Sequence, residues 1–301
     1  MSEQQTYRSG FVAIVGRPNV GKSTLLNAII GEKVAITSPK PQTTRHRILG
    51  VYHQPNMQIA FVDTPGMHKG KDLLNKKIDQ LAQSALNDVD VVLFVVDQKR
   101  SEKEDSIISY FKKRNCPVLL VINKIDRLNG KQKIDQIIMS YMGTYDYKAF
   151  IPISAKDFQF VDKLIEHIYP YLEEGPKYFP DDMKSDQSER MRMSELIREK
   201  ILYQTEQEVP HAVAVLIESI EENKELNTVD VSALIIVERP TQKQILIGKS
   251  GEKMKKIGME ARKDINAILN TRIHLSLWVK VKKDWRNRPT DLKSFGYGED
   301  V

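Results

Sequence analysis

The sequence predicts two domains: an α/β domain with a doubly wound, mainly parallel sheet, and after it a smaller α+β domain. Three observations carry this prediction. Short apolar segments alternate with longer amphipathic segments along residues 1–172. Two prolines, a glycine and clustered acidic residues break that pattern at 173–182. The chain of 301 residues is also long enough for two domains of roughly 150 residues each.

The first domain, residues 1–172, consists of apolar strands with room for a helix between them. Strands are expected near 11–15, 58–62, 91–96, 118–122 and 149–153, with a closing helix over 161–168. Polar motifs follow several of these strands directly. Open α/β sheets bind ligands at the carboxyl ends of their parallel strands. We therefore expect a ligand site at that edge of the sheet.

The second domain is expected over 188–285, after a linker over 173–187. Its expected elements are, in order, a helix from about 188 to 206, strands over 211–220 and 229–238, a Gly-x-x-Gly segment leading into a second helix, and a strand over 273–281. Residues 286–301 are expected to form a basic tail.

Composition favours a cytoplasmic, soluble protein. Charged residues make up 29% of the chain, and the mean hydropathy is −0.42. The single cysteine, Cys116, cannot form an internal disulfide. The N-terminal residues are polar and lack the apolar stretch of a signal peptide. No apolar run approaches the ~20 residues of a membrane-spanning helix.

A phosphate-binding loop follows the first apolar strand and precedes a helix. It reads Gly16, Arg17, Pro18, Asn19, Val20, Gly21, Lys22 and Ser23. In such a loop the backbone N–H groups converge on phosphates at the helix N-terminus. Lys22 is expected to reach the β- and γ-phosphate oxygens, and Ser23 to place its hydroxyl on Mg²⁺.

A second motif ends the strand at 58–62 and reads Asp63, Thr64, Pro65 and Gly66. A carboxylate at the end of a buried strand holds Mg²⁺ in many nucleotide sites, and the Gly66 N–H is placed to sense a γ-phosphate. By itself the motif is also a good β-turn sequence. Its position after the phosphate-binding loop and a strand favours the nucleotide role.

Two further motifs predict which base is bound. The first, Asn123, Lys124, Ile125 and Asp126, follows the strand at 118–122, and the second is Ser154, Ala155 and Lys156. Guanine presents N1–H and an exocyclic amine side by side, so one ionised carboxylate such as Asp126 accepts both hydrogen bonds. Adenine has no such pair of donors. The site is therefore expected to select GTP over ATP, with the Ser154 loop supporting the base.

These motifs resemble those of translation-factor-class P-loop GTPases, and the spelling of the loop is that of the Era-like branch. The resemblance implies GTP hydrolysis and a Mg²⁺ ion held by Ser23, Asp63 and a threonine from the segment 41–47. We assign Thr44, with Thr43 as the alternative. Met67 stands where Ras-like proteins carry the glutamine that orients water. In some relatives a P-loop asparagine, here Asn19, seats a potassium ion.

The Gly-x-x-Gly segment indicates a nucleic-acid site, because its glycines let the main chain approach phosphates. The expected RNA-binding residues are Ile247, Gly248, Lys249, Ser250, Gly251, Lys253 and Lys256. From Lys243 to Lys293 the chain carries fourteen basic and five acidic residues, a net charge of +9, whereas the whole chain is +6. That concentration of charge favours a polyanion. The order of elements resembles a type II KH domain.

A GTPase domain followed by one type II KH domain resembles the Era family over nearly the whole chain. The resemblance implies a GTPase that binds GTP and GDP with Mg²⁺ and binds the 3′ end of small-subunit (16S) ribosomal RNA during assembly of that subunit. It also implies a peripheral association with the inner, cytoplasmic face of the membrane. The default oligomeric state is a monomer.

Two alternatives differ in class from an RNA-binding switch. One is a signalling switch whose basic domain docks on a protein or an anionic membrane surface. The other is an enzyme that modifies RNA and uses GTP only for gating. The Gly-x-x-Gly segment disfavours the first. The second is disfavoured because no cysteine nucleophile, metal cluster or second cofactor motif is evident outside the first domain.

Overall fold

The computed structural model describes residues 6–66, 72–84, 86–114, 116–128 and 130–297, and it contains two compact units. Unit 1 comprises Met1–Thr37, Thr44–Lys69 and Ile78–Asp186. Unit 2 comprises Ser38–Thr43, Gly70–Lys77 and Gln187–Val301. No helix in the described part of the chain is long and apolar enough to span a bilayer.

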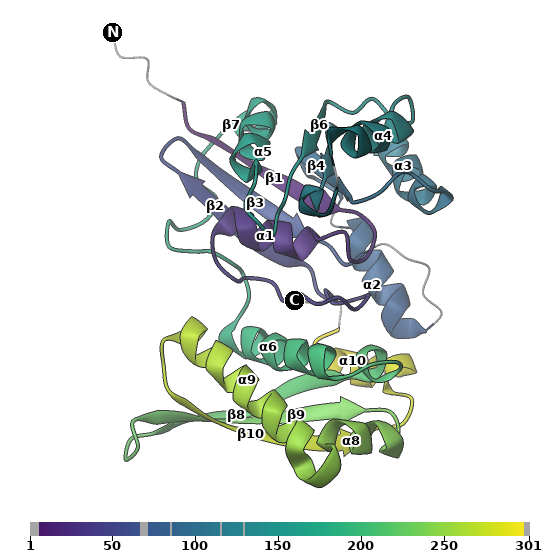
Figure 1. Cartoon of the computed structure of the whole chain (residues 1–301). Helices are drawn as coiled ribbons and strands as arrows, with labels where there is room; N and C mark the ends of the chain where they lie inside the picture. Colours follow the sequence, from purple (N-terminus) through teal and green to yellow (C-terminus); the bar gives the residue numbers. More distant parts are fainter. Residues whose placement is uncertain (1–5, 67–71, 85, 115, 129, 298–301) are drawn as a thin grey trace. The chain divides into compact units, whose positions relative to one another are not determined.

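Unit 1 holds a mostly parallel sheet of seven strands in the order β2-β3-β1-β4-β5-β6, with β7 paired to β1 (Figure 1). Strands β1, β3, β4, β5 and β6 run parallel to one another, whereas β2 is antiparallel to β3 and β7 is antiparallel to β1. The strands are β1 (Arg8–Val15), β2 (Ile48–Gln54), β3 (Met57–Asp63), β4 (Val91–Val96), β5 (Val118–Ile122), β6 (Ala149–Pro152) and β7 (Glu173–Glu174). The predicted fold class is confirmed, and β2 and β7 are additions to it.

Helices cover both faces of this sheet, as a doubly wound fold requires (Figure 1). One apolar core joins alternate residues of the strands to α1 and α5, and a second core joins the remaining strand residues to α3 and α4. The helices are α1 (Lys22–Ile30), α2 (Leu73–Ser84), α3 (Glu102–Arg114), α4 (Lys131–Tyr141) and α5 (Val161–Ile168), with short 3₁₀ turns at Ile125–Arg127 and Tyr169–Tyr171.

The predicted linker lies along the edge of this sheet. The Gln58 side chain accepts hydrogen bonds from the N–H groups of Tyr178 (2.8 Å) and Phe179 (3.0 Å), and it donates to Phe179 O (2.8 Å). The Val51 N–H donates to Lys184 O (2.9 Å). These hydrogen bonds attach the segment after β7 to strands β2 and β3. The segment therefore belongs to unit 1.

Unit 2 contains a three-stranded sheet in the order β10-β9-β8, with α6 and α9 along one face (Figure 1). The Ser188 side chain caps α6 by accepting from Met191 N (3.3 Å). The elements are α6 (Glu189–Gln204), α7 (Val209–Ala212), β8 (Ala214–Asn223), β9 (Thr228–Val237), α8 (Pro240–Ile247), a 3₁₀ turn (Lys249–Gly251), α9 (Glu252–Leu269) and β10 (Ile273–Val281). This order is the predicted type II KH arrangement.

The stretch predicted as a basic tail is folded as far as it is described. A 3₁₀ turn at Trp285–Asn287 leads into α10 (Pro289–Ser294). The buried Trp285 ring contacts Phe295 edge to face and Tyr297 in a stacked arrangement. The prediction of a tail relied on the basic residues of this segment. Its aromatic residues pack together and hold the segment in unit 2.

Candidate functional site

The phosphate-binding loop joins β1 to α1 and wraps around the Lys22 amine. Lys22 Nζ donates to Gly16 O (3.2 Å) and Arg17 O (3.1 Å), and the side chain is buried. Its position at the first turn of α1 places a positive charge beside the N–H groups of a helix N-terminus. Both features favour a bound phosphate group.

Two glycines let the motifs approach one another closely. Gly21 has φ +98°, and a β-carbon there would lie 2.3 Å from Asn123 Nδ2. A β-carbon on Gly66 would lie 2.8 Å from Pro18 N. A larger residue at Gly21 would displace the Asn123 side chain, and one at Gly66 would require the backbone at Pro18 to shift. The phosphate-binding loop therefore lies directly against the motifs at 63–66 and 123–126.

Three oxygen-bearing side chains meet beside Lys22. Ser23 Oγ donates to Asp63 Oδ2 (2.6 Å) and is 2.7 Å from Thr44 Oγ1. Thr43 points elsewhere: its hydroxyl lies 2.7 Å from Ser38 Oγ and donates to Lys40 O (2.7 Å). Of the two adjacent threonines, the geometry therefore favours Thr44 as the metal ligand.

Burial controls the charges at this cluster. It raises the pKa of the Asp63 carboxyl to about 6, although the Lys22 charge and hydrogen bonds from Ser23 and Thr44 oppose the shift. Burial also lowers the pKa of the Lys22 amine to about 8, although Asp63 opposes that shift. Each group therefore stabilises the charged form of the other. Additional positive charge at this point would favour the ionised carboxylate further.

These residues fit a magnesium ion. Asp63 Oδ1 is buried and has no hydrogen-bond partner, and such an atom calls for a ligand. Mg²⁺ prefers oxygen ligands and takes one or two carboxylates from the protein together with substrate phosphates. Within the described ranges, no three His, Cys, Asp or Glu side chains gather as a metal site. The single carboxylate with two hydroxyls therefore matches a metal that phosphates help to bind.

The base-recognition motifs are held together by Asn123. Its Oδ1 accepts from Lys124 N (2.8 Å) and Ala155 N (3.0 Å), and its Nδ2 donates to Val20 O (2.9 Å). Asn123 thus connects three loops. The Asp126 carboxylate is exposed and accepts from Ser154 Oγ (2.7 Å), which fixes one of its oxygens.

Other predicted site residues have different positions. The buried Thr64 hydroxyl donates to Ile14 O (3.0 Å), which anchors the turn at β1. Lys156 is exposed after Ala155. Met67 lies outside the described residues.

Two acidic residues that the motif search missed support the nucleotide loops. Asp97 pairs with Lys124 Nζ (2.6 Å), and the same amine donates to Asn19 O. Glu104 is buried and pairs with Arg17 (3.1 Å), while it also accepts from Ser101 N and Ser101 Oγ. Asp97 directly follows β4, so its place at the carboxyl edge of the sheet could have indicated a role in the nucleotide site. Glu104 lies within α3, and no feature of the sequence there indicates such a role.

In unit 2, the Gly-x-x-Gly segment forms a tight turn between α8 and α9. Gly248 has φ +72° and Gly251 φ +82°. A β-carbon on Gly248 would lie 2.8 Å from Lys253 Cβ, whereas one on Gly251 would meet nothing within 4 Å. Lys249 and Ser250 are exposed at the tip of the turn. The backbone here is open to a ligand, next to the positive end of the 18-residue helix α9.

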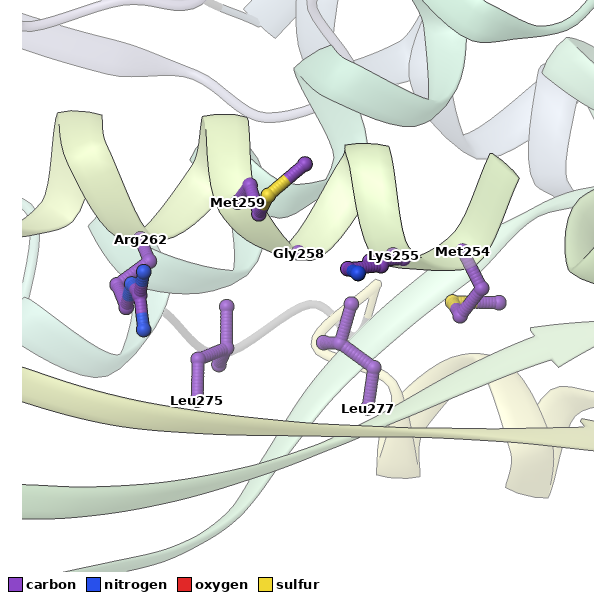
Figure 2. Close-up of a pocket in the computed structure, with 7 residues that line it drawn as sticks. All are labelled: Met254, Lys255, Gly258, Met259, Arg262, Leu275 and Leu277. Carbon is purple, nitrogen blue, oxygen red and sulfur yellow. The ribbon is translucent and has the colours of Figure 1, made fainter. Parts of the chain in front are cut away.

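A pocket of about 270 Å³ lies between β10 and α9, the helix that follows this turn (Figure 2). Leu275 and Leu277 rise from β10 toward the helix, and Lys255 and Arg262 lie on the helix side. Gly258 leaves room at the centre, because its missing β-carbon would lie 3.5 Å from Leu277 Cδ1. The full lining is Met254, Lys255, Gly258, Met259, Arg262, Leu275 and Leu277.

The lining differs from the predicted RNA-binding set. Lys256 is not among the lining residues and lies 3.9 Å from Glu260, which accepts from Gln204 of α6, so its predicted role in RNA binding stays a prediction. Lys255 and Arg262 occupy the pocket side of α9 instead. An apolar floor with cationic walls suits an unstacked nucleobase and its phosphates.

Comparison with known proteins agrees with both units. The profile of a family described as 50S ribosome-binding GTPase matches residues 11–124, and a KH-domain profile matches 208–286. Era from Aquifex aeolicus, as a variant bound to GDP and AlF₄⁻, is 41% identical over 97% of this chain and 99% of its own, with a TM-score of 0.94. The same values hold for Era in complex with MgGDPNP and nucleotides 1506–1542 of 16S ribosomal RNA.

Fold and site together define a GTPase with a C-terminal KH domain. The 41% sequence identity to Era, over 97% of this chain, then identifies the family within this class. The chain belongs to the Era family.

Proposed function

We propose that this GTPase binds guanine nucleotides with Mg²⁺ and binds the 3′ end of 16S ribosomal RNA during assembly of the small ribosomal subunit. One observation carries the proposal: an open Gly-x-x-Gly turn leads into α9, and α9 and β10 line a pocket with cationic and leucine side chains, in a chain that matches an RNA-bound Era over 97% of its length. Residues 1–172 would serve as the nucleotide domain and 188–285 as the RNA domain.

The nucleotide site promotes hydrolysis mainly by positioning and charge. Lys22 and the loop N–H groups would hold the phosphates, and Gly66 lies against the loop, where a β-carbon would be 2.8 Å from Pro18 N. Ser23, Thr44 and Asp63 are the residues that would hold Mg²⁺, which when bound neutralises charge on the β- and γ-phosphate oxygens.

Lys22→Ala should abolish GTP hydrolysis, because it removes the buried cation of the phosphate-binding loop.

We expect intrinsic hydrolysis to be slow, on the order of 10⁻⁴ s⁻¹ or below, because Met67 cannot orient water and no arginine finger is assigned. If Asn19 seats a potassium ion, as we propose, single-turnover rates should be at least several-fold higher in potassium than in sodium. Asn19→Ala should remove that difference. Equal rates of the unaltered protein in both salts would contradict the proposed role of Asn19.

RNA recognition is tested by titrating the full chain, loaded with GDPNP, into a fluorescent RNA that covers the 3′ end of 16S ribosomal RNA. An RNA of equal length and composition but shuffled order is the control. We expect clearly tighter binding to the natural segment at the same salt concentration, because charge alone does not distinguish the two RNAs. Equal affinities would contradict the proposed substrate.

Filling the pocket should weaken RNA binding without unfolding the domain. Gly258→Leu places a side chain over the Leu277 floor, and leucine is also the better helix former by roughly 1 kcal/mol. We expect affinity for the 3′-end RNA to fall about tenfold or more while the melting temperature is unchanged or higher. Gly258→Ala, whose β-carbon makes only ordinary contact, is the matched control. Unchanged affinity of Gly258→Leu would exclude the pocket as the RNA site.

We also propose that the protein is a cytoplasmic monomer, part of which associates with the inner face of the membrane through the basic surface of 243–293. Cosedimentation with phosphatidylglycerol vesicles, in the presence and absence of RNA, tests the membrane part. Competition by RNA is expected, because one positive surface would serve both polyanions. Failure to bind the vesicles would restrict the protein to the cytoplasm.

A further inference from the structure

The side chain of Trp278 is 62% exposed on β10, the edge strand of the sheet of unit 2. The other tryptophan of the sequence, Trp285, is fully buried and donates its Nε1–H to Ala212 O (3.1 Å). Tryptophan is highly buried on average, because its large apolar ring gains most from leaving water. The exposure of Trp278 is therefore a candidate sign of a binding surface.

Trp278 belongs to an apolar strip on the sheet face opposite the pocket. Side chains alternate between faces along a strand, and Leu275 and Leu277 point toward α9 (Figure 2). Trp278 therefore points away from that helix. The strand register places it beside Leu234, which lies beside Leu216, and both leucines are half-buried. The strip crosses all three strands, with its most exposed member at the edge.

Charge differs between the two sides of Trp278 along β10. Lys280, two residues further on and thus on the same face, is exposed, and so is Lys283 after the strand. Neither lysine forms an ion pair with any residue in the described part of the chain. In the opposite direction, His274 is in register with Asp230, which lies beside Glu221. The two exposed lysines therefore attract a polyanion to their side of Trp278, whereas the other side mixes acidic residues with His274 and the exposed Arg272.

We propose that Trp278 stacks on a base of single-stranded RNA that has left the pocket and crossed the edge of the sheet. Leu277 and Trp278 are consecutive residues, and no further strand covers β10 among the described residues. An RNA strand that leaves the pocket therefore reaches Trp278 by passing over the edge of β10, where Lys280 would supply a phosphate contact. Stacking on an aromatic ring tolerates any base, so this contact adds affinity without sequence selection. The inference rests on the proposed RNA binding of the pocket.

RNA length separates the two contacts. The test compares an RNA of four nucleotides, the length that a Gly-x-x-Gly turn clamps, with RNAs extended to about ten nucleotides at either end. We expect Trp278→Ala to bind one of the extended RNAs about tenfold more weakly than the unaltered protein does. Binding of the four-nucleotide RNA should be unchanged. Trp278→Phe should restore much of the loss, because phenylalanine also stacks.

Fluorescence gives a second readout that does not depend on affinity. Trp278 should be quenched by acrylamide in the free protein and protected once the extended RNA binds, whereas buried Trp285 is shielded in both states. The four-nucleotide RNA should give no protection. Tyr203→Ala, which removes a 53% exposed aromatic ring from α6, is the matched control and should leave binding unchanged.

The outcomes distinguish this inference from the proposed function. If Gly248→Asp leaves the four-nucleotide RNA bound normally, the proposed RNA site itself is wrong. If Gly248→Asp abolishes binding but Trp278→Ala weakens neither extended RNA, only the stacking role of Trp278 is overturned. Protection of Trp278 by phosphatidylglycerol vesicles but not by extended RNA would also overturn it, and would assign the strip to a membrane surface.

Discussion

Asp126→Asn should lower the affinity for GTP by about 100-fold or more and raise the affinity for xanthosine triphosphate. The Asp126 carboxylate is exposed and accepts from Ser154 Oγ (2.7 Å) through Oδ1, and an ionised carboxylate has further lone pairs for the two donors of guanine. An asparagine oxygen keeps the bond from Ser154, while its amide donates to the oxygen that xanthine carries at position 2. One of the guanine donors then faces the N–H₂ group of the asparagine side chain. Two opposed donors lower the binding free energy far more than the loss of one hydrogen bond does.

Competition of both triphosphates against a fluorescent GDP analogue measures this exchange of specificity. Ser154→Ala is the matched control, because it removes the support of the carboxylate and keeps its charge. We expect that variant to lose GTP affinity more modestly and to gain none for xanthosine triphosphate. If Asp126→Asn retained its preference for GTP, Asp126 would not face the base.

Gly248→Asp should reduce RNA affinity about 100-fold while leaving nucleotide affinity unchanged. Its β-carbon would lie 2.8 Å from Lys253 Cβ in a backbone conformation that favours glycine, and the carboxylate adds negative charge where phosphate must approach. The nucleotide site belongs to the other compact unit, and none of its ligating residues comes from α8 or α9. Titration with the 3′-end RNA at fixed salt, together with nucleotide binding, measures both effects.

A second variant keeps this prediction testable if Gly248→Asp does not fold. Lys249→Asp reverses the charge at the neighbouring exposed position without a steric clash, so the domain should remain folded and RNA binding should still fall strongly. Normal RNA binding by a folded Gly248→Asp variant would reduce the KH domain to a fold without the expected ligand.

The parallel strands and the motifs at their carboxyl ends were predictable because continuous apolar runs and glycine-rich loops are local signals. Strand β2 was not, because Gly50 interrupts its apolar run and the strand ends in the polar residues His53 and Gln54. The structure explains that glycine: a β-carbon there would lie 2.7 Å from Leu26 Cδ1. A side chain at this position would have to displace Leu26 of α1, and sequence alone does not report that contact.

Some site residues were likewise predictable from local sequence, whereas others depend on tertiary packing. Lys22, Ser23 and Asp63 follow from spacing, whereas the choice between Thr43 and Thr44 depends on the direction of one turn. Lys255 and Lys256 are consecutive, and only the packing of α9 against α6 and β10 decides which of them faces the pocket. Tertiary contacts, not local pattern, therefore select among adjacent candidates.

Crosslinking of the protein to RNA in cells at its native level, followed by sequencing of the bound RNA, tests the central claim most directly. The proposed function predicts that crosslinked reads concentrate at the 3′ end of 16S ribosomal RNA, and that Gly248→Asp removes this peak while the protein level is unchanged. Reads spread evenly over cellular RNA, or a 3′-end peak that survives Gly248→Asp, would contradict it.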